Sequence, residues 1–299
     1  IGYRALSANT SGTPNTAVGS DALRDNTTGI ENTAVGSGCL TVNTTGGYNT
    51  AIGRGALDAN TTASNNVAVG YGALGSNTTG ASNTAVGYAA LDANTTEDNN
   101  TAVGYNALGA NTTGNQQVAI GADALAANTT GTINTAVGHN ALKTNTTGDA
   151  NVALGRNTLY TNATGDYNVA IGYDCLFYNT VDNNVAIGHE AMYGTTTGDK
   201  SVAVGKSALK AATTGGSNIG VGYAAAYGVT TGTNNVALGK NTLYNNNPSE
   251  CVVIGNSAGG WLNTGANGTV AIGYDALADS TQGSWNLAIG HQAMDACTN

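Results

Sequence analysis

The amino-acid sequence predicts an all-β fold, a parallel β-solenoid of about 18 coils that are each about 17 residues long. A five-residue pattern, N-[T/V]-A-[V/I/L]-G, recurs along the chain, and its glycine marks 18 units. The step between marks is 17, with two steps of 16 and one of 18. A unit this short has no room for two helices and a turn, but it suits one coil of a solenoid. Only 9% of the 299 residues are charged and 44 are glycine, which is typical of a repetitive chain rather than of an average soluble domain with about 25% charge.

The same composition excludes several other classes of protein. Glycine, asparagine and threonine interrupt every apolar run, so none approaches the roughly 18 residues of a membrane-spanning helix, and we expect no membrane span in this segment. Disorder usually requires many charges and prolines, and this chain has only two prolines. Collagen needs glycine at every third residue, a period that the chain lacks. What remains is a folded repeat protein.

The strand of each coil is predicted at the start of the repeat. We number the 17 repeat positions along the consensus N-[T/V]-A-[V/I]-G-Y-x-A-L-x-A-N-T-T-G-x-x. Repeat positions 2 to 4 are β-branched or small, which favours a strand. Position 4 is aliphatic in all 18 units and position 9 is leucine in 14 of them, so in-register stacking predicts two aliphatic ladders, the second from another strand of the coil. At about 4.8 Å per coil, 18 coils would form a rod of roughly 85 Å.

Two orientations of this strand are open. Side chains alternate along a strand, so repeat positions 2 and 4 share one face and position 3 the other. Position 3 is alanine in 15 of the 17 units that contain it. In the first orientation, positions 2 and 4 face the interior and the alanine face is covered by other copies of the chain, packed side by side as a homo-oligomer. In the second, alanine faces a narrow interior while positions 2 and 4 point outward.

The corners of the coil are predicted at the asparagines and glycines. Stacked asparagine side chains at repeat positions 1 and 12 can bond to one another and to the turn backbone. The glycines at positions 5 and 15 are expected to take a positive φ. A charge in the consensus would meet its own copy about 4.8 Å away and repel it, which explains why charge is rare.

The repeat is least regular near its C-terminal end. It slips by one residue at Asn179–Asp182 and again at Asn245–Pro248, and the coil at about 245–268 is irregular. Trp261 in that coil either covers the flank of the solenoid or belongs to a recognition loop, since exposed aromatic side chains can stack on sugars. We expect residues 1–299 to form a single β-solenoid repeat domain. The sequence begins and ends inside a unit, so we also expect it to be a segment of a longer chain.

Repeat position 6 gathers the side chains with the richest chemistry. Tyrosine, histidine, arginine and lysine occupy it in most units. This pattern indicates either a solvated or inter-chain edge that favours long side chains, or a stripe that contacts a glycan, a surface or a further subunit. With Trp261 added, the candidate contact residues are Tyr71, Tyr88, Tyr105, His139, Arg156, Tyr173, His189 and Trp261.

Enzymatic chemistry is not expected. His139, His189 and His291 lie about three to six coils apart and have no repeated carboxylate or cysteine partner, so they can form neither a catalytic triad nor a metal site within one chain. No phosphate-binding loop or dinucleotide fingerprint is present. We therefore expect no catalytic residues, no metal and no cofactor. The net charge of −9 and the lack of basic clusters disfavour a nucleic-acid partner.

The four cysteines do not form a disulfide framework. Cys39 and Cys175 occupy repeat position 8, where alanine is usual, so we expect them to be buried. Cys251 and Cys297 lie two coils apart at different repeat positions, which makes a bridge between them implausible.

The units resemble a known class of repeat. Asn168-Val169-Ala170-Ile171-Gly172 looks like the repeats of trimeric autotransporter adhesin heads, and the longer unit from Asn100 to Leu108 is similar to repeats of phage tail fibres and bacterial surface proteins. The resemblance covers essentially the whole chain. It implies a left-handed parallel β-roll with three chains side by side. The match departs from the family in its longer repeat, and no membrane anchor or fibre chaperone is recognisable.

Three functions are compatible with these observations. The leading hypothesis is a structural and adhesive fibre shaft, extracellular and on a cell surface or virion, that forms a homotrimer and contacts host or surface glycans. The second is a subunit of an extracellular filament whose rods join end to end. The third is an ice-binding solenoid, because rows of threonine on a flat solenoid face can order water.

Overall fold

The protein is an all-β parallel solenoid. Its computed structural model describes residues 1–245, 247–262, 265–279 and 283–295. Every regular element in these ranges is a three-residue strand, and none is a helix. Each strand occupies repeat positions 2 to 4, as predicted. The chain divides into two compact units, Ile1–Ala150 (unit 1) and Asn151–Asn299 (unit 2).

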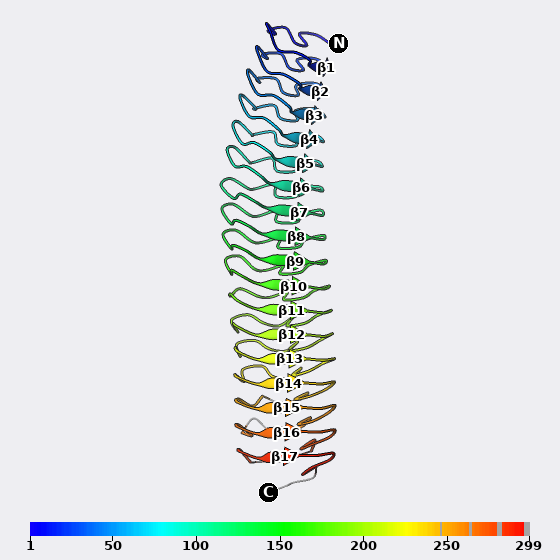
Figure 1. Ribbon diagram of the computed structural model, residues 1–299, viewed down its shortest axis with the longest axis vertical. Coiled ribbons are helices and arrows are strands. Elements are labelled where there is room, and N and C mark those ends of the chain that lie inside the picture. The colour runs from blue at the N-terminus through cyan, green and yellow to red at the C-terminus, as the bar shows by residue number, and fades with distance from the viewer. Residues whose placement is uncertain (246, 263–264, 280–282, 296–299) are drawn as a thin grey trace. The chain divides into compact units, whose positions relative to one another are not determined.

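Unit 1 repeats without interruption. Each of its strands pairs in parallel with the next, and the paired residues are 17 positions apart, as in Thr84↔Thr101. The coils stack on one another in register (Figure 1). The eight strands are β1 (Thr16–Val18), β2 (Thr33–Val35), β3 (Thr50–Ile52), β4 (Val67–Val69), β5 (Thr84–Val86), β6 (Thr101–Val103), β7 (Val118–Ile120) and β8 (Thr135–Val137).

Unit 2 keeps the same pairing although its repeat length varies. The partners Val169↔Val185 and Val236↔Val252 differ by 16 in residue number, and Val252↔Val270 differ by 18, but every strand stays in register. The corners therefore absorb the lost and added residues. The nine strands are β9 (Val152–Leu154), β10 (Val169–Ile171), β11 (Val185–Ile187), β12 (Val202–Val204), β13 (Ile219–Val221), β14 (Val236–Leu238), β15 (Val252–Ile254), β16 (Val270–Ile272) and β17 (Leu287–Ile289).

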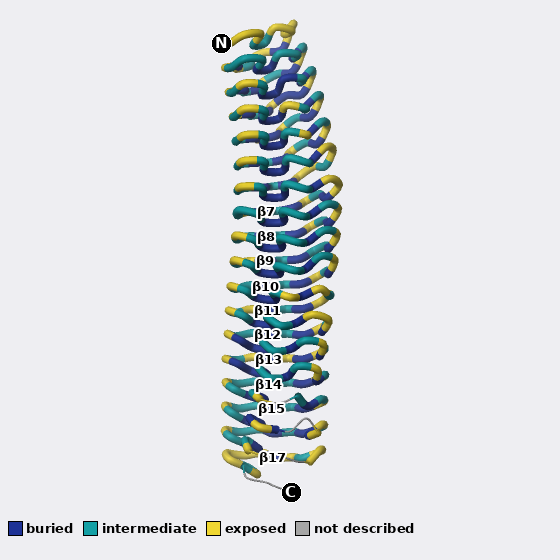
Figure 2. Tube along the Cα trace, turned by 180° about the vertical axis from the view of Figure 1, so that it is seen from behind, coloured by how far each residue is buried: buried dark blue, intermediate teal, exposed yellow. Residues whose placement is uncertain are grey.

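The strands turn their alanine inward. Ala34, Ala102 and Ala186 at repeat position 3 are fully buried, whereas Val18 and Leu154 at position 4 are 41% and 46% exposed. In Figure 2, buried residues accordingly alternate with half-buried and exposed ones along the coils of each unit. Of the two predicted orientations, the one with positions 2 and 4 inside is wrong and the one with alanine inside is correct. The reason is the narrow interior, which leaves room for a methyl group opposite the leucines of position 9.

The leucine ladder at repeat position 9 forms the other wall of the interior. Leu23, Leu108 and Leu209 are among its members and are fully buried. The prediction of a buried ladder is confirmed, but the prediction of a second strand is wrong, because repeat positions 6 to 11 form turns in the described coils. These leucines have a positive φ, 51° at Leu23 and 54° at Leu108. This conformation is uncommon for residues with a Cβ, and here it turns the chain while pointing the side chain into the core.

Asparagine ladders hold the corners, as predicted. At repeat position 12, the Asn43 amide Nδ2 donates to Oδ1 of Asn26 at 2.8 Å and to the carbonyl oxygen of Gly46 at 3.0 Å. Asn60 repeats this with Asn43 at 2.9 Å. These side chains are fully buried, and buried amides are stable only when they are hydrogen-bonded.

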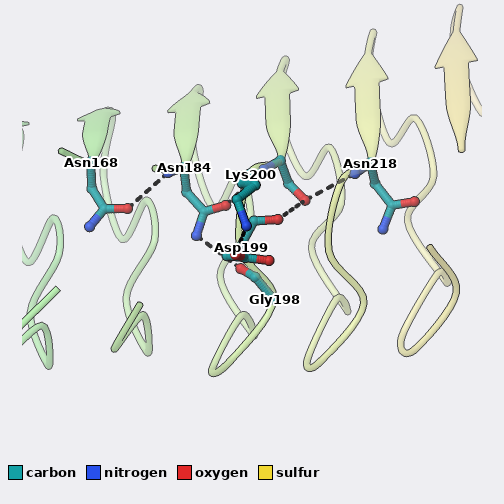
Figure 3. Close-up of polar contacts among 7 residues, drawn as sticks. Asn168, Asn184, Gly198, Asp199, Lys200 and Asn218 are labelled. Carbon is teal, nitrogen blue, oxygen red and sulfur yellow. Dashed lines mark hydrogen bonds and ion pairs between the residues drawn. The ribbon is translucent and has the colours of Figure 1, made fainter. Parts of the chain in front are cut away.

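A second ladder runs along repeat position 1 (Figure 3). The backbone N–H of Asn184 donates to Asn168 Oδ1 at 3.0 Å, and Asn184 Nδ2 donates to the carbonyl oxygen of Gly198 at 2.9 Å. Ser201 replaces asparagine in the next coil, and its Oγ accepts from the backbone N–H of Asn218 at 3.1 Å. The ladder therefore ties each coil to the one before it through a side chain.

The two recurrent corner glycines of the repeat have different reasons to be glycine. At repeat position 5 the φ is positive, as predicted; it is +144° at Gly87, where a Cβ would also collide with the carbonyl oxygen of Gly104. At position 15 the prediction of a positive φ is wrong. Gly29 has no positive φ, but a Cβ there would collide with the Gly46 carbonyl oxygen and with Asn26 Oδ1. Close stacking of the coils, rather than backbone conformation, excludes a side chain at that corner.

Candidate functional site

The outer face of the strands is a long apolar surface. We call it the strand face, and it consists of repeat positions 2 and 4 of each strand. In unit 2 both positions are aliphatic in all nine strands, and Ile219 and Val221 of β13 are 39% and 37% exposed. Side chains two residues apart on nine strands spaced about 4.8 Å cover roughly 400 Å². Patches of about this size mark interaction sites on many monomeric proteins.

The strand face of unit 1 is more polar. Its position 4 is aliphatic, but position 2 is threonine in six of its eight strands and valine in Val67 and Val118. The threonines are Thr16, Thr33, Thr50, Thr84, Thr101 and Thr135. A row of hydroxyls therefore runs beside a row of aliphatic side chains in unit 1, whereas unit 2 presents two aliphatic rows.

The predicted contact stripe at repeat position 6 is exposed and partly stacked in unit 1. The rings of Tyr71 and Tyr88 lie 5.3 Å apart with an interplanar angle of 8°, and those of Tyr88 and Tyr105 lie 5.4 Å apart. The Arg54 guanidinium lies 5.8 Å from the Tyr71 ring centroid. All three tyrosines are about half exposed. The coil repeat thus produces a short column of parallel rings with a cation at one end.

In unit 2 the same stripe brings together three more of the predicted residues. Arg156 lies 5.6 Å from the Tyr173 ring centroid, and the Tyr173 and His189 rings stack 5.4 Å apart. His189 Nδ1 is 3.5 Å from Glu190 Oε2. Tyr274 and His291 form a separate stack at 5.3 Å.

Two predicted residues stand apart from these stacks. His139 is exposed at repeat position 6 of unit 1, but Ala122 occupies that position in the preceding coil, so the tyrosine column ends at Tyr105. Trp261 is 58% exposed and occupies repeat position 11, at a different corner from the stripe. The irregular coil around it includes Asn246, Asn263 and Thr264, which lie outside the described residues.

An aromatic column at repeat positions 10 and 11 of unit 2 was not predicted. Its rings stack in pairs, Tyr160 with Phe177 at 4.9 Å and Tyr227 with Tyr244 at 5.1 Å. Tyr193 lies 5.4 Å from Phe177 and 5.3 Å from Tyr178. We call these residues the position-10 column. The sequence contained the signal, because position 10 is aromatic in most coils from Tyr160 to Tyr244.

The ion pair of Lys210 and Glu190 lies in the middle of the position-10 column. Lys210 Nζ lies 2.8 Å from Glu190 Oε2 and 6.0 Å from the Tyr193 ring centroid. The hydrogen bond from Lys210 lowers the pKa of the Glu190 carboxyl and raises that of Lys210 itself. A hydrogen bond with Tyr178 is the main cause that raises the pKa of Tyr193. The ion pair thus places the Lys210 ammonium over the Tyr193 ring.

The described cysteines are structural. Cys39, Cys175 and Cys251 are buried and free. Burial raises the pKa of the Cys39 thiol to about 11 and that of Cys175 to about 12. A thiol with so high a pKa is a poor nucleophile near neutral pH. Cys39 and Cys175 therefore replace alanine as predicted, while Cys297 lies outside the described residues.

No protein-family model matches the chain, and no curated protein matches it either. Among the described residues, no three or more histidine, cysteine, aspartate or glutamate side chains come together in a way that could hold a metal ion. The same residues include no helix of the length and apolarity that crossing a membrane would require. A function is therefore proposed from the strand face and the aromatic columns.

Proposed function

We propose that this chain is a structural and adhesive fibre shaft, extracellular and on a cell surface or virion, whose copies pack side by side as a homotrimer. The observation that carries the proposal is the strand face of unit 2, two aliphatic rows without a charged side chain among them. Leaving such a face in water is unfavourable at about 25 cal/mol per Å². Covering it stabilises the assembly.

A second copy of this chain is the occupant that fits the strand face best. The face repeats every coil at the same spacing, so a neighbouring copy presents rows with the matching period, and branched side chains of one copy can lie between those of the other. Unit 2 supplies roughly 400 Å², and the aliphatic half of the unit 1 face adds to it. Unit 2 alone thus supplies about half of the area that each partner contributes to a standard interface, which is about 800 Å².

The proposal is tested by the mass of the chain in solution. Sedimentation equilibrium should give about three times the 29.5 kDa of one chain. Val221→Asp places a carboxylate on the strand face and is expected to dissociate the assembly, because a buried unpaired charge is costly. Ala211→Asp is the matched control, since Asp25 and Asp279 already occupy its repeat position in other coils. A wild-type chain that sediments as a monomer overturns the proposal.

The adhesive part of the proposal rests on the stripe at repeat position 6. Its half-exposed tyrosine rings present flat apolar faces with hydroxyl tips, a surface that sugars stack on. Binding of the purified chain to immobilised glycans should decrease when Tyr88 at the centre of the unit 1 stack is changed to alanine. Tyr48→Ala, which removes an equally exposed tyrosine at another repeat position, serves as the control. Equal glycan binding by both variants and wild type contradicts this role for the stripe.

Ice binding is a second candidate, favoured by one observation. The strand face of unit 1 presents six threonines, interrupted by Val67 and Val118, beside a row of aliphatic side chains. This candidate needs the face open to water, whereas the shaft needs it covered. Thermal hysteresis in a solution of the chain would support ice binding, and freezing at the equilibrium melting point would exclude it.

A further inference from the structure

A pocket lies in unit 2 beside the irregular coil. It has a volume of about 260 Å³ and is lined mainly by Gly260, Trp261, Asp275, Ala278, Asp279 and Asp295, from the coils of β15, β16 and β17. At about 30 Å³ per water molecule, this is space for roughly nine waters, enough for a small ring with its substituents. Trp261 is 58% exposed. The pocket therefore combines a hollow with an accessible aromatic face.

The pocket arises where the position-10 column stops. Tyr227 and Tyr244 stack at 5.1 Å, and the following coils have Gly260 and Ala278 at the same repeat position. The coil of Gly260 stacks directly on the coil of Tyr244, because the backbone N–H of Asn245 donates to the Gly260 carbonyl oxygen at 3.2 Å. Small residues thus occupy the place where a ring would continue the column. Trp261, at the adjacent position 11, stands beside that place.

The polar lining of the pocket accepts hydrogen bonds and carries negative charge. Three aspartates line the pocket, and none of its lining residues is a lysine or an arginine. All ion pairs of the described residues lie between residues 4 and 210. The one lining hydroxyl, Ser257 Oγ, lies 2.9 Å from Asn256 Oδ1, to which it donates. A complementary ligand must supply donors and positive charge.

The carboxylates do not suit a bare ion. In the ranges that the structure describes, no set of three or more acidic, histidine or cysteine side chains has the geometry of a metal site. A ligand that fills the pocket and bonds to each carboxylate with a separate donor group suits this lining better. Its flat side would pack on Trp261, as apolar ring faces do.

We propose that this pocket binds a sugar ring that carries a protonated amine. The ring occupies the place left by the position-10 column, against Trp261. The ammonium donates a charge-assisted hydrogen bond to one of the aspartates, and this bond is stronger than one between neutral groups. Cation–π attraction to the indole adds to it. The biological role of this binding rests on the adhesive part of the proposed function. The binding itself does not depend on the chains forming a trimer.

The test is a titration of the complete chain with glucosamine as the probe. In a Trp285→Phe background, Trp261 is the only tryptophan, so its fluorescence reports the pocket directly. Glucosamine is expected to saturate the signal and to bind at least tenfold more tightly than glucose or N-acetylglucosamine, which have the ring without the charge. It should also bind at least tenfold more tightly than cadaverine, which has ammonium groups without the ring.

Variants separate the pocket from the fold. Ala278→Tyr extends the position-10 column into the pocket and should abolish binding, and tyrosine already occupies this repeat position in the coils of Tyr227 and Tyr244. Calorimetry should show the same loss for Trp261→Ala and none for the matched control Trp285→Ala. Failure of glucosamine to bind, equal binding of glucose or cadaverine, or unchanged binding by a folded Ala278→Tyr chain would overturn the proposal.

The outcome is separable from that of the proposed function. Sedimentation of the same samples gives the mass of the assembly. A trimer that does not bind glucosamine overturns the pocket and leaves the shaft, whereas a monomer that binds it overturns the shaft and leaves the pocket.

Discussion

Replacing Asn218 with alanine should destabilise unit 2 by about 4 kcal/mol, because this side chain is a buried link of the ladder at repeat position 1. Asn218 Nδ2 donates to the Gly232 carbonyl oxygen at 2.8 Å, and Asn218 Oδ1 accepts from the backbone N–H of Asn235 at 3.0 Å. Oδ1 also accepts from Asn235 Nδ2 at 3.0 Å. The residue is fully buried, so water cannot replace these bonds.

The magnitude follows from the groups that alanine leaves without a partner. Asn235 Nδ2 keeps its second bond, to the Pro248 carbonyl oxygen at 2.8 Å. The Gly232 carbonyl and the Asn235 N–H lose the partners described above, and a buried orphaned group costs about 1–3 kcal/mol. Asn218→Ser should cost only about 2 kcal/mol, because Ser201 already accepts from the next backbone N–H at this repeat position.

Urea unfolding followed by circular dichroism measures the change. Hydrogen exchange at β13 and β14 then locates it, since repeat proteins open in local segments. Asn256→Ala is the control: Asn256 is exposed at a turn and its loss should change stability by less than about 0.5 kcal/mol. If Asn218→Ala is no more destabilising than Asn256→Ala, the ladder does not hold the coils together.

Three further results are expected. Gly222→Ala should destabilise unit 2 by about 3 kcal/mol or more, because φ is +134° and a Cβ would collide with the next coil, whereas Gly265→Ala, with open space around it, should be nearly neutral in urea titrations. Cys175 should resist alkylation at pH 8 until the chain unfolds, since burial raises its pKa to about 12; rapid alkylation of the folded chain would contradict this. Glu190→Gln should lower stability at pH 7 by up to about 1 kcal/mol. The pKa of Glu190 is lowered in the fold, so its contribution to stability is present above the unfolded-state pKa and is lost as the pH falls through the folded-state value. A difference in unfolding free energy between wild type and variant that persists in strong acid would contradict the ion pair.

The repeat predicted the architecture because every coil carries nearly the same residue pattern. The 17-residue spacing, the strand at repeat positions 2 to 4 and the asparagine ladders are all confirmed. The orientation of the strand was harder, because both of its faces are apolar and alternation alone does not tell which one is inside. The width of the interior determines which face is inside. That width depends on turns with a positive φ at residues such as Leu108, and a leucine in the sequence does not predict a positive φ.

The candidate sites could likewise be predicted only in part. Spacing predicted that Tyr71, Tyr88 and Tyr105 share one stripe, because residues 17 apart come to lie above one another, but the stacking of their rings was not predicted. Spacing could equally have predicted the position-10 column, which appears once the residues at that repeat position are compared. The pocket at Trp261 could not be predicted, because it depends on where rings are missing and on how an irregular coil places its backbone.

Electron cryomicroscopy of the purified chain tests the proposal that copies of this chain cover one another's strand faces. Three chains side by side, with the strands of each facing the common axis, are expected. Single chains, or assemblies in which the strand faces point to solvent, would contradict it.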